Sequence, residues 1–304
     1  MCDLNLEIWE KELGNDFDKE FLLDGIKNGF QIINSDCKLP ENIISKNHPS
    51  AHPNSPLYDK AHAQILLELE NGNYAFADFT PKIISPLGIL QKPDGGVRII
   101  HDCSMPLGSA VNDFAGDLPK QKYQTVDDAS KLVTPDCFMA KVDLKSAYRS
   151  VHISSHSQQV TGFKWIFPDG KEYILYDRKL PFGAKLAPNI FHRLSQAIKR
   201  MMSRRGFTII AYLDDFFLCE ATQERCIEAL NTLLELLCKL GFLISWSKVA
   251  GPSQQMTIFG VEIDSTNMEL RLPKAKLSEL KLDLADFRQR KRATKNSYSP
   301  YWVN

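Results

Sequence analysis

Apolar and polar residues recur along the chain with two spacings, one typical of helices and one typical of strands. Helical spacing predicts helices over 57–70, 125–133, 188–204 and 222–240. Gly72 and Gly241 follow the first and last of these as stop signals. Short apolar runs and Pro-Asp-Gly turns predict strands or strand pairs over 86–102, 137–143, 161–178, 207–219, 243–247 and 257–263. Because such turns indicate antiparallel hairpins, the interleaved elements predict an α+β fold rather than a doubly wound parallel sheet.

The first 80 residues differ from the rest in both pattern and charge. Short helices are expected around Leu4–Leu13 and Phe17–Phe30, an extended linker over 34–56, and the start of a compact domain near Ile83. The first 80 residues contain 6 Lys and 14 acidic residues, whereas the remainder contains 31 basic and 23 acidic residues. Although the whole chain has no net charge, this asymmetry favours a polyanion-binding surface beside an acidic extension.

Composition excludes several classes of protein. The chain is 43% hydrophobic and 24% charged, which is typical of a globular protein. Its apolar runs are far shorter than the roughly 20 residues of a membrane-spanning helix, and its first thirty residues are acidic, unlike a signal peptide. We therefore expect an intracellular protein that is neither secreted nor inserted in a membrane. The seven cysteines have no CxxC spacing, so neither a disulfide framework nor a structural zinc site is indicated.

Three carboxylates lie at the ends of apolar strands. Asp143 ends the run Ala-Lys-Val-Asp, and the pair Asp214 and Asp215 lies between two strongly apolar strands. A surface turn explains two adjacent acids equally well when they are considered alone. A third acid at the end of another strand favours a site where a cation neutralises the charges. Oxygen ligands without neighbouring His or Cys fit Mg²⁺ or Mn²⁺.

Six motifs, in this order, resemble the fingers and palm of a reverse transcriptase from a retroelement. They are SPLGILQKPDGGVRIIHD, KVDLKSAYRSVHI, LPFGAKLAPNIF, YLDD, LGFLISWSKVAGP and IFGVEID. The similarity covers roughly residues 80–290. Among such enzymes the chain is most similar to those of DIRS-type retrotransposons, through the segments SAVND, SKVAGP and MELRLPKAKL.

The resemblance implies a right-hand polymerase fold with fingers, a palm and part of a thumb. The expected divisions are an acidic extension and linker over 1–80, fingers over 81–136, a palm over 137–266 with a fingers insertion near 154–180, and a partial thumb with an unrelated tail over 267–304. The similarity stops near residue 292, before the family's thumb ends, so we expect a truncated thumb. A single basic helix over 271–295 is expected to lack a partner that would bury Leu277, Leu280 and Leu284.

The resemblance also implies an activity, namely addition of deoxynucleotides to a primer 3′-hydroxyl on an RNA or DNA template. Two divalent ions, Mg²⁺ or Mn²⁺, support that reaction. The resemblance makes Asp143 and Asp214 the shared metal ligands, with Asp215 contributing less directly and the carbonyl of Leu144 as a further ligand. Lys248 is a candidate general acid for the departing pyrophosphate, with a plain surface lysine as the alternative.

Five residues match substrate-contacting positions of the family. Tyr148 matches the ring that excludes a ribose 2′-hydroxyl. Lys92 and Arg98 flank the fingers turn, where they would contact phosphates. Phe182 and Gly183 match the pocket floor, and Phe182 replaces a glutamine of retroviral enzymes. For Tyr148 the alternative is an ordinary buried tyrosine. For Lys92 and Arg98 it is a solvated hairpin without a ligand.

A further set of residues is expected to contact nucleic acid. Arg193, Arg200 and Arg204 lie away from the apolar face of helix 188–204, where they could meet template phosphates, although solvated arginines explain the pattern as well. Phe259 and Gly260 match the primer grip. Because of the truncated thumb, two other hypotheses stay open beside an active polymerase: an inactive nucleic-acid-binding remnant and a domesticated scaffold.

Overall fold

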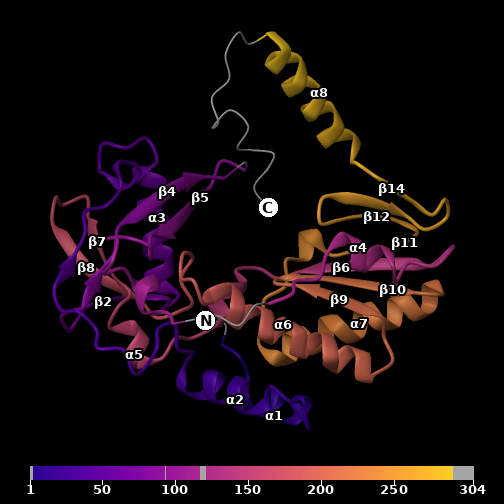
Figure 1. The fold of residues 1–304 in the computed structure, drawn as a ribbon, viewed down its shortest axis with the longest axis horizontal. Coiled ribbons are helices and arrows are strands. Elements are labelled where there is room, and N and C mark those ends of the chain that lie inside the picture. The colour runs from indigo at the N-terminus through magenta and orange to yellow at the C-terminus, as the bar shows by residue number, and fades with distance from the viewer. Residues whose placement is uncertain (1–2, 93, 117–120, 290–304) are drawn as a thin grey trace.

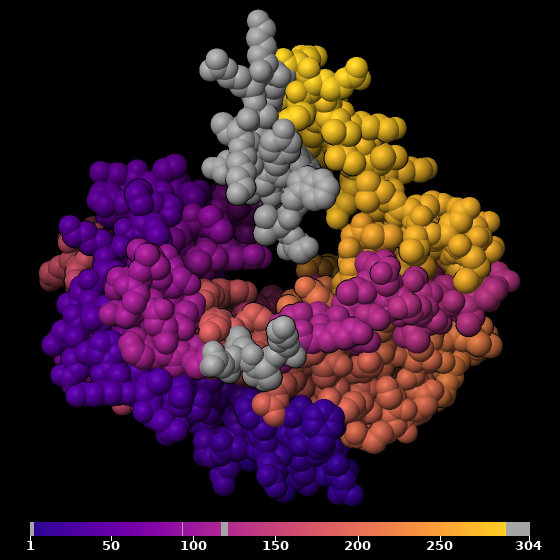
Figure 2. All heavy atoms as spheres, viewed as in Figure 1, coloured from indigo at the N-terminus to yellow at the C-terminus, as the bar shows by residue number. Residues whose placement is uncertain are grey.

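The structure is a computed structural model that describes residues 3–92, 94–116 and 121–289 of the 304-residue chain. The strands belong to four separate sheets, and the elements form two lobes that lie side by side (Figure 1). The atoms leave a hollow between the lobes (Figure 2). No helix in the described part of the chain is long and apolar enough to cross a membrane.

The first lobe contains a five-stranded sheet and a separate hairpin. The order of the sheet is β1 (Ile43–Ile44), β3 (Ile83–Ile84), β7 (Gly162–Ile166), β8 (Glu172–Asp177) and β2 (Tyr74–Phe76). Beside it lie the hairpin of β4 (Leu87–Gln91) and β5 (Val97–His101), the helix α3 (Tyr58–Glu70) and the short helix α5 (Ser155–Gln158). Both strand pairs expected around Pro-Asp-Gly turns are therefore confirmed as antiparallel hairpins.

The second lobe is built on a four-stranded antiparallel sheet. Its order is β11 (Ala250–Ser253), β6 (Phe138–Asp143), β10 (Asp215–Glu220) and β9 (Ile209–Tyr212). The helices α6 (Ala187–Arg204) and α7 (Gln223–Leu240) cover one face, and the short α4 (Val126–Ser130) lies nearby. Strand alternation places Val142 and Phe216 in the core with these helices, so Asp143 and Asp215 share the opposite face of the sheet.

A small three-stranded sheet leads to the last described helix. Its strands are β12 (Gln255–Ile258), β13 (Val261–Asp264) and β14 (Glu269–Arg271), and α8 (Lys274–Gln289) follows. Within Lys274–Gln289 no residue is buried. Leu277 and Leu284 are exposed, as expected from the sequence, and Leu280 is half-buried. The expected continuation of this helix to residue 295 lies outside the described residues.

Two sequence predictions of strands are wrong. Residues 243–247 form no strand, because the chain turns there into a 3₁₀ turn at Trp246–Lys248, and β11 begins only at Ala250. Residues 257–263 are not one strand but the tip of the β12–β13 hairpin. Phe259 and Gly260 have φ angles of 48° and 78°, and this left-handed pair reverses the chain.

The prediction that a compact domain begins near Ile83 is also wrong. The expected N-terminal helices form as α1 (Leu6–Leu13) and α2 (Lys19–Asn28), and Trp9 and Leu22 are fully buried in the main core beside α6 and α7. The indole of Trp9 donates to the carbonyl of Leu240 at 3.1 Å. The segment 34–56 is no free linker, because β1 within it pairs with β3. The N-terminal residues are therefore part of both lobes.

Candidate active site

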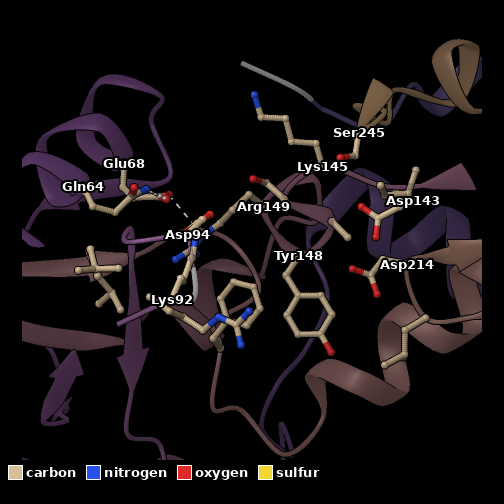
Figure 3. A pocket seen from close by; sticks show the side chains of 18 of the residues that line it. Gln64, Glu68, Lys92, Asp94, Asp143, Lys145, Tyr148, Arg149, Asp214 and Ser245 are labelled. Atoms are coloured by element: carbon tan, nitrogen blue, oxygen red, sulfur yellow. Dashed lines mark hydrogen bonds and ion pairs between the residues drawn. The ribbon is translucent and has the colours of Figure 1, made fainter. Parts of the chain in front are cut away.

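A pocket of about 620 Å³ opens between the two lobes, and charged residues of both signs line it. Figure 3 shows Asp143 and Asp214 on one side, Lys92 on the other, and the ring of Tyr148 between them. Arg98 also lines the pocket. Eight of the residues predicted from the sequence are thus brought together here: Lys92, Arg98, Asp143, Leu144, Tyr148, Phe182, Asp214 and Lys248.

Backbone pairing brings the three carboxylates to one place. Asp143 at the end of β6 is directly opposite Asp215 at the start of β10, and Asp215 in turn pairs with Tyr212 of β9. Leu213 and Asp214 therefore form a two-residue hairpin loop. The amide of Leu144 donates to the carbonyl of Asp214 at 3.1 Å and fastens the loop to β6. Leu213 has a φ of 51°, a left-handed conformation that costs about 1 kcal/mol for a residue of this size and is typical of functional sites.

The three carboxylates repel one another in a site that is partly shielded from water. Burial, together with the charges of Asp214 and Asp143, raises the pKa of Asp215 to about 7. Burial, with the charge of Asp143, also raises the pKa of Asp214. The ammonium of Lys248 lies 3.0 Å from both carboxylate oxygens of Asp143, and this hydrogen bond raises the pKa of Lys248. The carboxylate of Asp143 therefore already stabilises one cation, the ammonium of Lys248.

The donor set suits a hard divalent cation. Asp143 and Asp214 present carboxylate oxygens to the pocket, and none of the described His or Cys residues lines it. Among the described residues, no group of three or more acidic, His or Cys side chains is placed to hold a metal ion by itself. Mg²⁺ commonly binds through one or two carboxylates and takes its other ligands from water and substrate phosphates. The residues present fit such an ion, with Asp215 adding negative charge from the strand beside Asp143.

Asp215→Asn is expected to stabilise the metal-free chain by about 1–2 kcal/mol more at pH 8 than at pH 5. The pKa of Asp215 rises from 3.8 to about 7 on folding, so the folded chain holds this proton more tightly. The contribution of the Asp215 carboxyl to the free energy of unfolding is fully present below pH 4 and is lost as the pH rises to about 7. Urea denaturation in EDTA at both pH values measures the effect, with the exposed Asp59→Asn as control. Equal effects at both pH values would contradict the assignment.

The aromatic side of the pocket is a stacked ring pair. The rings of Tyr148 and Phe182 have centroids 5.0 Å apart and planes inclined by 25°, and Phe191 lies behind Tyr148 at 5.5 Å. Burial raises the pKa of the Tyr148 hydroxyl, so this group stays neutral. The ring of Tyr148 is half-buried and lines the pocket, and its exclusion of a ribose 2′-hydroxyl stays a prediction. A rigid ring at this place limits the room available beside Asp143.

Gly183 follows Phe182 but does not line the pocket. Its φ is 127°, and a β-carbon there would clash with the backbone carbonyl of His101. The side-chain amide of Asn112 donates to the carbonyl of Gly183 at 3.0 Å. The glycine therefore lets the segment after Phe182 pack directly on the end of β5.

Gly183→Ala is expected to lower the free energy of unfolding by about 3 kcal/mol, because it adds both backbone strain and a clash with main-chain atoms. Gly95→Ala is the matched control. Gly95 also has a positive φ, 80°, but open space surrounds its missing β-carbon, so about 1 kcal/mol is expected. Urea denaturation compares the two variants. If Gly183→Ala lowers the free energy of unfolding no more than Gly95→Ala does, the close approach of Gly183 to the carbonyl of His101 is unimportant.

The template-phosphate role predicted for three arginines is wrong, because their charges face the N-terminal helices. Arg193 donates to Asp18 at 2.5 and 3.1 Å, and Arg200 donates to Asp16 at 2.7 and 2.8 Å. Arg204 donates to the carbonyl of Glu12 at 2.7 Å. The guanidinium groups of Arg193 and Arg200 also lie over the rings of Phe21 and Phe17. The basic face of α6 therefore holds the acidic N-terminal region in place.

The residues matched to the primer grip lie near the site but outside the pocket lining. Phe259 and Gly260 form the tip of the β12–β13 hairpin, and the Phe259 ring contacts Tyr212 at a centroid distance of 5.3 Å. Tyr212 pairs with Asp215, so this tip lies next to the carboxylates. Contact with a primer stays a prediction.

Sequence reasoning missed the far wall of the pocket. Gln64 and Glu68 of α3, Tyr74 of β2 and Arg149 all line it. Arg149 directly follows Tyr148, and this adjacency is the one signal that could have singled it out. The acids and amides of α3 have no such signal, because charged residues on a helix usually face solvent.

Curated viral polyproteins are similar to part of the chain. The Gag-Pol polyprotein of Avian reticuloendotheliosis virus is 27% identical over 146 residues, 46% of this chain and 12% of the relative. The Gag-Pol polyprotein of Feline leukemia virus is 30% identical over 125 residues, 40% of this chain and 7% of the relative. The Genome polyprotein of Petunia vein clearing virus is 28% identical over 123 residues, covering 40% and 5%. The chain thus spans a small part of the length of these relatives.

Solved structures share the fold. A foamy viral protease-reverse transcriptase in complex with double-stranded DNA matches with a TM-score of 0.66 and 19% identity, covering 99% of this chain and 52% of that chain. The same kind of protein in complex with an RNA/DNA hybrid matches with a TM-score of 0.64 and 19% identity, covering 92% and 38%. The expected right-hand polymerase fold is confirmed. The profile described as "Reverse transcriptase (RNA-dependent DNA polymerase)" matches residues 90–263, more than half of the chain, and the chain therefore belongs to the reverse transcriptase family.

Proposed function

We propose that this chain is an RNA-directed DNA polymerase that adds deoxynucleotides to a primer 3′-hydroxyl with the help of two divalent metal ions. The observation that carries the proposal is the meeting of Asp143, Asp214 and Asp215 at one hairpin tip, with Lys92 and Arg98 across a pocket of about 620 Å³. The carboxylates of Asp143 and Asp214 suit metal ions, and the cations of Lys92 and Arg98 suit a triphosphate. Membership in the reverse transcriptase family supports the same activity.

The roles of the residues follow from their charges. Asp143, Asp214 and the carbonyl of Leu144 would hold Mg²⁺ or Mn²⁺, and Asp215 adds negative charge beside them. The bound ions would lower the pKa of the primer hydroxyl and neutralise the phosphates. Lys92 and Arg98 bind the triphosphate oxygens from the opposite wall. The raised pKa of Lys248 keeps its ammonium protonated, ready to give a proton to the departing pyrophosphate.

Selection of substrate is assigned to the ring pair and the neighbouring hairpin. The ring of Tyr148, stacked on Phe182, blocks the space that a ribose 2′-hydroxyl needs. Phe182 offers no hydrogen bond, so the floor selects by shape. The tip formed by Phe259 and Gly260 holds the primer end through its backbone. Template and primer are RNA or DNA, and the foamy viral structures with double-stranded DNA and an RNA/DNA hybrid support a duplex in the hollow between the lobes.

The proposed source is a DIRS-type retrotransposon, and the proposed place of action is inside the cell, where deoxynucleotides are available. The segments SAVND, SKVAGP and MELRLPKAKL support this source.

A primer-extension assay on an RNA template with Mg²⁺ or Mn²⁺, paired with filter binding of the same duplex, tests the activity. Extension and binding together support the polymerase. Binding without extension would replace it with an inactive nucleic-acid-binding remnant. Absence of both would leave a scaffold.

A further inference from the structure

A largely buried cluster of charged side chains surrounds Arg149 at the far wall of the candidate active site. Arg149 donates through Nη1 to both carboxylate oxygens of Asp177, at 2.8 and 2.7 Å, and through Nη2 to the hydroxyl of Tyr74 at 3.1 Å. Its Nε lies 3.3 Å from Oε2 of Glu68. The side chains of Arg149 and Asp177 are only 10% and 1% exposed. Loss of one partner would leave a buried charge unpaired, so the cluster has one strongly preferred geometry.

The cluster joins three segments that are far apart in the sequence. Arg149 lies in the 3₁₀ turn Ala147–Ser150 of the second lobe, Asp177 ends β8, and Glu68 belongs to α3 of the first lobe. Glu68 is itself held by two amide donors, Gln64 at 2.8 Å and Asn73 at 2.7 Å. The ion pairs therefore fix the turn after the catalytic strand to two elements of the opposite lobe.

The same arginine lies against the ring pair of the pocket. Tyr148 directly precedes Arg149, and its ring stacks on Phe182. The guanidinium carbon of Arg149 lies 5.9 Å from the centroid of the Phe182 ring, and that of Arg98 lies 5.9 Å from the same centroid. A shift of Arg149 would therefore move the backbone that carries Tyr148 and remove the support of the ring stacked on it.

We propose that Arg149 is a positioning residue that holds the Tyr148–Phe182 ring pair in place by anchoring its turn to Asp177, and so sets the discrimination between deoxyribonucleotides and ribonucleotides. This inference rests on the proposed function. A 2′-hydroxyl differs from hydrogen by one oxygen atom, so a displacement of the ring by less than 1 Å changes which sugar fits. Sugar selection then depends on an ion pair that need not touch the nucleotide.

Arg149→Lys tests this inference, because lysine keeps the positive charge but has one nitrogen in place of the three through which Arg149 contacts Asp177, Tyr74 and Glu68. The readout is kcat/KM for a deoxynucleotide divided by kcat/KM for the matching ribonucleotide. We expect this ratio to fall about tenfold, mainly through better use of the ribonucleotide. Asp177→Asn, which removes the other half of the pair, is expected to lower the ratio in the same direction.

Arg200→Lys is the matched control. Arg200 also donates to both carboxylate oxygens of one acid, Asp16, at 2.7 and 2.8 Å, but on the face of α6 that meets the N-terminal helices. Its replacement is expected to lower the melting temperature and to leave the discrimination ratio unchanged. A purely structural role for Arg149 would give the same result as this control.

The outcomes separate the inference from the function on which it rests. A wild-type chain that fails to extend a primer overturns both. If the wild type extends, an unchanged ratio in Arg149→Lys, or an equal change in Arg200→Lys, overturns the inference alone. An equal rise in KM for both nucleotides at an unchanged ratio also overturns it, because Arg149 would then bind phosphate directly. A lower ratio in both Arg149→Lys and Asp177→Asn supports it.

Discussion

Asp143→Asn and Asp214→Asn are each expected to reduce primer extension by about 10³-fold or more, with the fold intact. Each change removes a charge from the pocket side of the hairpin tip and leaves the packed residues Val142 and Phe216 untouched. The loss falls on catalysis because phosphoryl transfer depends on positioned charge more than on any other contribution. Single-nucleotide incorporation on an RNA template measures the effect, and circular dichroism checks the fold.

The exposed Asp59→Asn serves as the control for the loss of one negative charge. It is expected to extend primers at the wild-type rate. Extension by Asp143→Asn or Asp214→Asn within about tenfold of the wild type would remove the argument that these two carboxylates hold the metal ions.

Tyr148→Val is expected to lower discrimination against ribonucleotides by about 10²-fold, the second largest effect. Valine removes the ring that stacks on Phe182 and opens space beside Asp143. Incorporation of the deoxynucleotide is expected to change much less. Competing incorporation of matching ribo- and deoxyribonucleotides into one primer measures the ratio.

Tyr148→Phe separates the ring from its hydroxyl. Because the proposed block is steric, phenylalanine is expected to keep the wild-type discrimination. A Tyr148→Val variant that rejects ribonucleotides as well as the wild type does would show that another group excludes the 2′-hydroxyl.

Local pattern predicted the elements that carry the chemistry. Asp143 and Asp215 were predictable because Asp143 ends a strand whose apolar residues alternate and Asp215 begins a strongly apolar strand, and antiparallel pairing places them opposite each other. The two hairpins with Pro-Asp-Gly turns were predictable for the same kind of reason, since the turn and the flanking strands are both encoded locally. The prediction that Tyr148 lies in the substrate site came from the resemblance to a family, because a tyrosine after a strand does not by itself indicate a functional role.

Long-range partners were not predictable from local pattern. The residue spacing of α6 predicts the face of the helix on which its arginines lie. It does not predict that Asp16 and Asp18 pack against that face. For the same reason an acidic N-terminal region looked like an appendage, although its apolar residues complete the main core. Arg149 and Asp177 are separated by 28 residues, and only the folded sheet shows that they meet.

The central claim is that divalent ions held by Asp143 and Asp214 support nucleotide addition at this site. The most direct measurement is incorporation of a single deoxynucleotide on an RNA template while the free Mg²⁺ concentration is varied. No incorporation is expected in EDTA, and the rate is expected to rise with more than the first power of Mg²⁺ at low concentration because two ions take part. Incorporation that persists undiminished in EDTA would contradict the claim.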